Sequence, residues 1–255
     1  MCETCGCSIP GHEHPEPADT HTVEVLKGLM SSNDHAAAHN REHFDRSGVL
    51  VVNLMSSPGA GKTRLLEQTA AGLGGRLNIA VIEGDLETEN DAERLRRGGI
   101  RAHQITTGSA CHLDAHLIHR ALHEFPLADE QGAVDILFIE NVGNLVCPAA
   151  FDLGQHLNVV LLSTTEGDDK PAKYPVMFRA ADLVVVSKCG LLPMLDDFSV
   201  DRARASLAGL GNETPVIQTA AGRQPDITDW IAWLEARRAE HPATAEERAP
   251  ATQTA

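Results

Sequence analysis

The stretch that most constrains the fold is VVNLMSSPGAGKTRLLEQ, which occupies residues 51–68. An apolar, β-branched run ends at Ser57, a loop with two glycines follows, and Lys62 and Thr63 come directly before a helical pattern. A strand, a glycine loop and Lys-Thr at the start of a helix form the order of a phosphate-binding P-loop. The stretch therefore predicts a nucleotide site at the edge of an α/β domain.

Each residue type in this loop has a chemical reason to be there. Gly59 and Gly61 let the backbone turn its N–H groups toward phosphate oxygens, and Lys62 reaches the β- and γ-phosphates. The hydroxyl of Thr63 is a Mg²⁺ ligand. The full pattern has glycine at position 56, where this chain has Ser56. The residues expected to contact nucleotide here are Ser57, Pro58, Gly59, Ala60, Gly61, Lys62, Thr63 and Arg64.

Strand-like and helical patterns alternate along the rest of the chain, which predicts an α/β fold with a mostly parallel sheet flanked by helices. The expected strands are 48–57, 79–84, 102–107, 134–140, 158–164, 183–187 and 215–219. The expected helices are 23–44, 62–73, 89–98, 111–124, 171–181, 199–209 and 226–240. We expect a metal-binding tail and linker over 1–20, the nucleotide domain over 21–240, and a disordered C-terminal tail over 241–255.

Composition excludes several classes of function. The formal net charge of −15 argues against nucleic-acid binding, which needs a basic face. No apolar run approaches the ~20 residues that a membrane helix needs, and the N-terminus lacks a secretory signal pattern, so we expect a cytoplasmic protein. In a reducing cytosol, Cys2, Cys5 and Cys7 are better explained as metal ligands than as disulfide partners, although a disulfide remains an alternative.

Acidic residues follow two of the predicted strands. Asp85 ends AVIEGD, where it is expected to bind Mg²⁺ or orient the attacking water. Glu140 follows VDILFI, where it is expected to support the ligands of Mg²⁺ without binding the ion directly. Gly143 is expected to sense the γ-phosphate through its N–H. The alternative for either carboxylate is an ordinary cap or turn residue.

A second group of soft ligands lies on two separate segments. Cys111 and His112 are predicted in the first turn of a helix capped by Ser109, where the helix dipole would favour the thiolate. Cys147 is predicted in a loop before Pro148, four residues beyond Gly143. Two thiolates and an imidazole suit Zn²⁺ or Ni²⁺. The alternative is a pair of unrelated buried cysteines.

Histidines recur at helical spacing in two places. His35, His39 and His43 share one expected helix face, and so do His112, His116, His119 and His123. A solvated polar face is the favoured interpretation, and binding of an additional metal ion is the alternative.

Taken in order, seven segments make the chain resemble the hydrogenase nickel incorporation GTPases of the HypB type, which are SIMIBI-class P-loop metallochaperones. The segments are CETCGC, SSPGAGKT, AVIEGDLETENDAERL, GSACHLDAH, FIENVGNLVCPAAFDLG, TEGDDKPAKYP and SKCGLLP. The resemblance covers residues 1–7 and 48–235 and implies a GTPase of low intrinsic turnover that delivers nickel during [NiFe]-hydrogenase maturation.

The resemblance also implies ligand sets and partners. It implies a tight nickel site at Cys2, Cys5 and Cys7, where three thiolates and a nitrogen suit Ni²⁺. It implies a weaker nickel/zinc site at Cys111, His112 and Cys147, located where two protomers meet, with GTP promoting the homodimer. The implied partners are a HypA-type nickel/zinc accessory protein and the hydrogenase large subunit, and the implied cofactors are GTP, Mg²⁺, Ni²⁺ and Zn²⁺.

The base-reading loop departs from the family pattern Asn-Lys-x-Asp. The chain has Ser187, Lys188, Cys189 and Gly190 in these positions. Lys188 can still stack on the base, but Gly190 has no carboxylate to accept from the guanine N–H donors. Buried donors left without an acceptor cost about 1–3 kcal/mol of binding. We expect weakened guanine selectivity, unless Asp196 or Asp197 substitutes. Thr219 and Ala220 occupy the place of the other base-contacting loop, and Cys189 is expected to be structural.

Two other functions stay open at this level. The chain would be a nickel store or sensor if its altered base loop had lost useful turnover. It would serve urease or a cobalamin enzyme if the client differed, although the terminal CETCGC favours hydrogenase.

Overall fold

The computed structural model describes residues 20–85, 89–108, 110–130, 132–220 and 226–241. The chain divides into two units, residues 1–32 and 33–255. In the first unit the described residues are helical and belong to α1 (Thr20–Arg46). In the described part of the chain, no helix is both long and apolar enough to span a bilayer.

The second unit is built on a sheet of seven strands, in the order β3-β2-β6-β1-β7-β8-β9. All six pairings in this sheet are parallel. The strands are β1 (Leu50–Ser56), β2 (Ile79–Asp85), β3 (Arg101–Thr106), β6 (Ile136–Glu140), β7 (Leu157–Ser163), β8 (Leu183–Ser187) and β9 (Val216–Gln218). The predicted α/β class is therefore confirmed, and each predicted strand is present within two residues of its expected limits.

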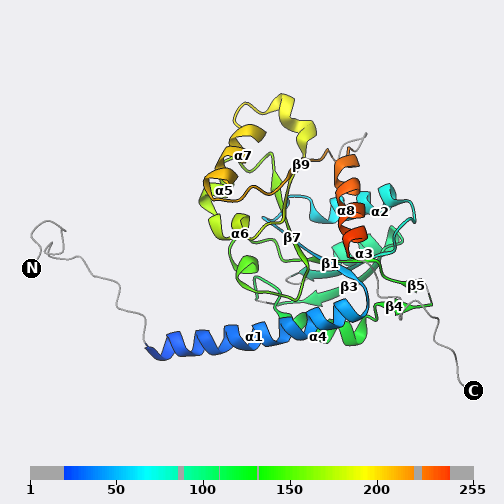
Figure 1. Ribbon diagram of the computed structural model, residues 1–255. Helices are drawn as coiled ribbons and strands as arrows, with labels where there is room; N and C mark the ends of the chain where they lie inside the picture. The colour runs from blue at the N-terminus through cyan, green and yellow to red at the C-terminus, as the bar shows by residue number, and fades with distance from the viewer. Residues whose placement is uncertain (1–19, 86–88, 109, 131, 221–225, 242–255) are drawn as a thin grey trace, which may run out of the picture. The chain divides into compact units, whose positions relative to one another are not determined.

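Helices cover both faces of this sheet (Figure 1). The α-helices of the second unit that follow α1 are α2 (Lys62–Leu73), α3 (Asn90–Arg97), α4 (Ala115–Glu124), α5 (Lys170–Lys173), α6 (Pro175–Arg179), α7 (Val200–Gly209) and α8 (Thr228–Glu240). One face packs against α2, α3 and α8, and the other against the end of α1, α4, α6 and α7. Because both faces are covered, the central strands are buried along their length and mostly apolar, as β1 illustrates with seven buried residues of which five are apolar.

Two partners from distant parts of the chain hold α2 against α8. Trp230 is fully buried, and its indole N–H donates to the Thr69 hydroxyl at 2.8 Å. Figure 1 shows these two helices side by side. The P-loop helix is therefore fixed at its back by an indole that is itself hydrogen-bonded, which is the usual requirement for burying tryptophan.

The structure corrects the predicted helices in two places. The helix expected over 111–124 begins only at Ala115, because Asp114 is its N-cap and accepts the Leu117 N–H at 2.8 Å. The helix expected over 171–181 is split into α5 and α6 at Tyr174, whose ψ of 58° is not helical. Pro175 follows it, and proline disfavours the helical conformation of the residue before it.

Three short elements were not predicted. They are a two-stranded hairpin of β4 (Ala128–Asp129) and β5 (Gly132–Ala133), and two 3₁₀ turns, η1 (Cys147–Ala150) and η2 (Cys189–Met194). The predicted C-terminal tail began at residue 241, but His241 is described and its ring lies 4.2 Å from that of His156. Residues 242–255 and residues 1–19 of the tail predicted over 1–20 lie outside the described part, whereas Thr20 begins α1.

Candidate nucleotide and metal sites

The P-loop connects the central strand β1 to α2. Gly59 and Gly61 have φ angles of 73° and 102°, in the left-handed region where a side chain is strained. Gly61 is also the N-cap of α2, and the space beside both glycines is open. These glycines are thus required by backbone conformation and not by crowding, and the loop presents the N-terminus of a helix to an anion.

Lys62 is buried, and its ammonium group donates to the Ser56 hydroxyl at 3.1 Å. Ser56 is the residue that departs from the P-loop pattern. Its side chain is fully buried and also donates to the Ser57 carbonyl at 2.7 Å, so the substituted residue fits the loop without blocking it. The Arg64 guanidinium pairs with Glu67 at 3.1 Å on the surface of α2, which leaves only its backbone directed at the loop.

The Thr63 hydroxyl donates to Glu140 Oε1 at 2.8 Å, and both side chains are buried. Burial raises the pKa of Glu140 to about 7, although the ammonium of Lys62 acts in the opposite direction. The second oxygen of this carboxylate is buried without a hydrogen-bond partner. A hydroxyl beside a desolvated carboxylate is a donor set that suits Mg²⁺, so the residues fit the ion that the P-loop implies.

Glu83 is the acidic residue that sequence reasoning missed. It lies on β2 directly opposite Glu140 on β6, and it is only 3 % exposed. Burial, followed by repulsion from Glu140, raises its pKa to about 8, and its Oε2 also has no hydrogen-bond partner. A carboxylate inside the otherwise apolar run AVIEGD was the available signal, because buried acids are rare without a function or a partner.

Asp85 and Gly143 lie near the same edge of the sheet. Asp85 ends β2, and its carbonyl accepts the Thr107 N–H at 2.9 Å. Gly143 lies so close to Pro58 that an added Cβ would be 2.9 Å from the Pro58 Cα. Only glycine fits in this contact, and the loop after β6 therefore touches the P-loop backbone where Gly143 was expected to sense the γ-phosphate.

The base-reading segment is tied to the P-loop by Ser187, whose hydroxyl donates to the Ala60 carbonyl at 2.7 Å. Lys188 follows with φ 60°, the one positive value among the non-glycine residues of the described part. The Thr219 carbonyl accepts the Cys189 N–H at 3.0 Å, so the two loops predicted to contact the base are adjacent.

A Cβ added to Gly190 would lie 4.0 Å from the Cβ of Ala220. The position therefore has room for a side chain, although the residue there is glycine. The nearby Cys189 thiol donates to the Val186 carbonyl at 3.2 Å, and burial raises its pKa. Cys189 is thus held within the fold as a thiol, in agreement with its predicted structural role.

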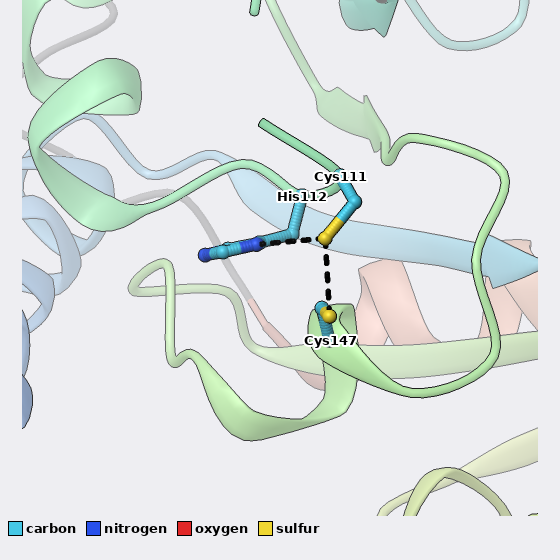
Figure 2. A group of neighbouring side chains, drawn as sticks. All are labelled: Cys111, His112 and Cys147. Atoms are coloured by element: carbon cyan, nitrogen blue, oxygen red, sulfur yellow. Dashed lines mark hydrogen bonds between the residues drawn. The ribbon is translucent and has the colours of Figure 1, made fainter. Parts of the chain in front are cut away.

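The structure brings Cys111, His112 and Cys147 together although Cys147 is distant in sequence. Figure 2 shows the Cys111 sulfur directed at both partners, 3.1 Å from the Cys147 Sγ and 3.7 Å from the His112 Nδ1. One donor atom from each residue lies within 4.8 Å of the others. The group is partly exposed, so an ion can reach it from solvent.

The electrostatics of this group differ from the prediction. Cys111 and His112 precede the N-cap of α4, so the predicted first-turn position is wrong. Ser109, the predicted cap, lies outside the described residues. A hydrogen bond with Cys111, and then burial, raise the pKa of the Cys147 thiol. Cys147 begins η1 instead of lying in an irregular loop.

His112 is prepared to be a ligand by its packing. Its ring stacks on that of Phe151 with centroids 4.1 Å apart. Burial lowers its pKa, while the Asp114 carboxylate acts in the opposite direction. The imidazole is therefore neutral at physiological pH, as metal coordination requires. The other predicted nickel ligands, Cys2, Cys5 and Cys7, lie outside the described residues.

A single buried side chain joins the cysteine group to the P-loop edge. Asn141 follows Glu140 directly, and its Oδ1 accepts the N–H of Leu113 at 3.2 Å and that of Val142 at 3.0 Å. Its Nδ2 donates to Asn53 on β1 at 3.3 Å. The loop that carries Cys111 and His112 is thus hydrogen-bonded to the segment that runs from Glu140 to Cys147.

Comparison with known proteins assigns this arrangement to a family. The family model described as the CobW/HypB/UreG nucleotide-binding domain matches residues 50–218. The chain belongs to this family. Within it the chain is of the HypB type. It is 49 % identical to the hydrogenase maturation factor HypB of Rhizobium leguminosarum bv. viciae over 91 % of this chain and 77 % of that protein.

Two further comparisons cover most of both chains. The hydrogenase/urease maturation factor HypB of Helicobacter hepaticus is 45 % identical over 86 % of this chain and 90 % of that one. The crystal structure of HypB from Helicobacter pylori in complex with nickel is 41 % identical, with a TM-score of 0.77 over 84 % of this HypB-type chain and 99 % of that one.

Proposed function

We propose that this HypB-type chain is a cytoplasmic nickel metallochaperone that binds and slowly hydrolyses GTP to deliver nickel during [NiFe]-hydrogenase maturation. The observation that carries the proposal is the continuous segment from Glu140, which accepts the Thr63 hydroxyl, to Cys147, which contacts Cys111. Nickel is the cargo, and the bound nucleotide sets how firmly the inner thiolate group holds it.

The P-loop edge provides the parts of a phosphoryl-transfer site. Lys62 and the N-terminus of α2 bind and orient the triphosphate, and Gly143 meets the terminal phosphate through its N–H. Thr63, with the carboxylates of Asp85 and Glu140, would hold Mg²⁺, which would supply positive charge to the phosphates. Catalysis of this kind depends on positioning and electrostatic stabilisation and needs no covalent intermediate.

Slow turnover is supported by how the neighbouring arginines are paired. Glu67 receives both Arg64, at 3.1 Å, and Arg94, at 2.5 Å. An arginine held by a carboxylate is not available to stabilise charge on the transferring phosphate, which is the role of an arginine finger. A slow hydrolysis step would delay nickel release after nickel binding.

The cargo site supports Ni²⁺ or Zn²⁺, because two thiolates and a neutral imidazole form a borderline-soft donor set. These three residues leave a coordination position open for a ligand from a second copy of the chain or from a partner. This supports the proposed nucleotide-dependent homodimer and transfer between the chain, a HypA-type nickel/zinc accessory protein and the hydrogenase large subunit. Cys2, Cys5 and Cys7 would form a separate nickel site.

The deciding experiment measures nickel affinity of the inner site in the full chain with Cys2, Cys5 and Cys7 replaced by Ala. Nickel affinity and self-association are compared in GDP and in a non-hydrolysable GTP analogue. Both should change with nucleotide, and Lys62→Ala should remove the difference. Lys173→Ala is the control, because Lys173 forms an exposed ion pair with Asp169 and should leave the difference intact. Nickel affinity and self-association that ignore the nucleotide would overturn the proposal.

Maturation in cells separates this gate from a nickel store. Hydrogenase activity should be lost with Lys62→Ala, whereas survival of activity together with nickel binding would favour storage. The Helicobacter hepaticus relative is named for both hydrogenase and urease maturation, so urease activity should be measured in the same strains. Loss of urease activity alone would assign the chain to that client.

A further inference from the structure

Three imidazoles from two helices meet at a place separate from the thiolate group. His39 lies on α1, within the second unit, and His119 and His123 lie one turn apart on α4. The rings of His39 and His119 have centroids 5.0 Å apart, and those of His119 and His123 are 4.8 Å apart. Both pairs meet edge to face. The sequence pattern favoured a solvated polar face here, and the structure shows histidines of the two stripes in contact with one another.

We propose that His119 and His123 chelate a divalent transition-metal ion of borderline softness, Zn²⁺ or Ni²⁺, and that His39, whose ring packs against that of His119, becomes the third ligand when its side chain turns toward the ion. This would be a metal site additional to the group of Cys111, His112 and Cys147. Imidazole is a ligand that both ions accept.

The spacing of the two donor atoms carries the proposal. The Nε2 atoms of His119 and His123 are 3.3 Å apart. Two nitrogens bound at ~2.0–2.1 Å to a tetrahedral ion are separated by about 3.3–3.4 Å, so the pair already has the spacing that Zn²⁺ needs. In the absence of metal, one Nε2–H donates to the other Nε2. Bidentate binding requires that both rings carry their proton on Nδ1.

The part of α1 that carries His39 is held in place by side chains near it on the same helix. Asn40 Nδ2 donates to the carbonyls of Ala115, at 2.8 Å, and Leu153, at 3.1 Å. Asn33 Oδ1 accepts the Ala115 N–H at 2.9 Å. These buried bonds fix this part of α1 to the first residue of α4, and His39 therefore faces His119 on a rigid support. Sites on rigid elements lose less entropy when they bind a ligand.

His39 and His123 are exposed, so water can complete the coordination sphere.

Among the described residues, Asp45, His156 and His241 also have potential ligand atoms within 4.8 Å of one another. The nitrogens of His156, however, are not available to bind a metal ion. The Nδ1 of His156 accepts the Val51 N–H at 2.8 Å, so its proton must be on Nε2. That Nε2–H donates to Asp45 at 2.9 Å. Both nitrogens are thus committed within the fold, whereas a proton shift frees both Nε2 atoms of His119 and His123.

The test uses the full chain with Cys2, Cys5, Cys7, Cys111 and Cys147 replaced by Ser, which removes the thiolate ligands. Equilibrium dialysis with Zn²⁺, and separately with Ni²⁺, should detect a bound ion in this variant. His119→Ala together with His123→Ala should lose that ion, and His39→Ala should raise its dissociation constant by about tenfold or more. His119→Gln with His123→Gln repeats the test with side chains of high helix propensity, in case the alanine variant unfolds.

The matched control is His35→Ala together with His103→Ala, which also removes two imidazoles, one on α1 and one on β3. This variant should bind the ion as the chain with the five Cys→Ser replacements does. No ion in that five-serine chain, or binding that survives the loss of His119 and His123, would overturn the proposal. Loss in the control to the same extent as in the double variant would overturn it as well.

Discussion

Replacement of Asn141 by alanine should make nickel affinity independent of the bound nucleotide, although it removes no residue that is proposed to contact the nucleotide or the metal. Asn141 is buried between Glu140, whose carboxylate accepts the Thr63 hydroxyl, and the loop that carries Cys111. Its side chain is the hydrogen-bonded link between these two places. If the nucleotide acts on nickel through this link, the affinity ratio between the GTP-analogue and GDP states should fall toward one in Asn141→Ala.

The cost to stability follows from three hydrogen bonds, to the N–H groups of Leu113 and Val142 and to the side-chain Oδ1 of Asn53. At about 1 ± 0.5 kcal/mol each, their loss destabilises the fold by about 1.5–4.5 kcal/mol. This corresponds to a fall of about 5–15 °C in the melting temperature. The variant should still fold, because domains of this size have stabilities of about 5–15 kcal/mol.

Asn212→Ala is the matched control. Its side chain also makes three hydrogen bonds, donating to Phe178 and Ala181 and accepting from Thr214, at a distance from the P-loop in the sequence. Nickel affinity is measured in both nucleotide states for the two variants, below their melting temperatures. Asn212→Ala should lose comparable stability and keep the ratio. A ratio that persists in Asn141→Ala, or is lost equally in the control, would refute the coupling argument.

Three further changes test the P-loop edge and the base loop. Burial and repulsion from Glu140 raise the pKa of Glu83 from 4.5 to about 8, so the free energy of unfolding without Mg²⁺ should fall as pH rises through this range. Glu83→Gln should make the free energy of unfolding less dependent on pH, as measured by urea unfolding in the presence of a chelator. Gly143→Ala places a Cβ 2.9 Å from Pro58 and should cost about 1–3 kcal/mol of nucleotide binding, measured by titration calorimetry. In competition binding, the wild type should prefer GTP over ATP by less than about a thousandfold, and Gly190→Asp should increase the preference by about tenfold or more.

The strands and the P-loop were predictable because their signals are local. A strand buried on both faces is mostly apolar, and β1, β2 and β6 each begin with an apolar run of at least three residues. The order of strands in the sheet has no such signal, since it depends on contacts between segments far apart in sequence. The start of α4 was misplaced because apolar spacing alone does not show that Asp114 caps the helix.

Only some residues of the candidate sites could be predicted from the sequence, for the same reason. Cys111, His112 and Cys147 were proposed as one group from residue type, and the structure places them together. Asn141 carries no sequence signal of its role, because a buried asparagine and an exposed one look alike in a single sequence. The contact between His39 and His119 required the packing of α1 against α4, which helical spacing within either segment cannot show.

The position of β1 in the middle of the sheet has a consequence for synthesis of the chain. Its two neighbours, β6 and β7, end at Glu140 and Ser163, long after β1 itself has left the ribosome. Such non-local pairing makes folding slow, and the cradle for phosphate cannot close until most of the polypeptide has emerged. A nascent chain stalled before β7 would therefore carry cysteines and histidines that can meet metal ions before the chain can bind a nucleotide.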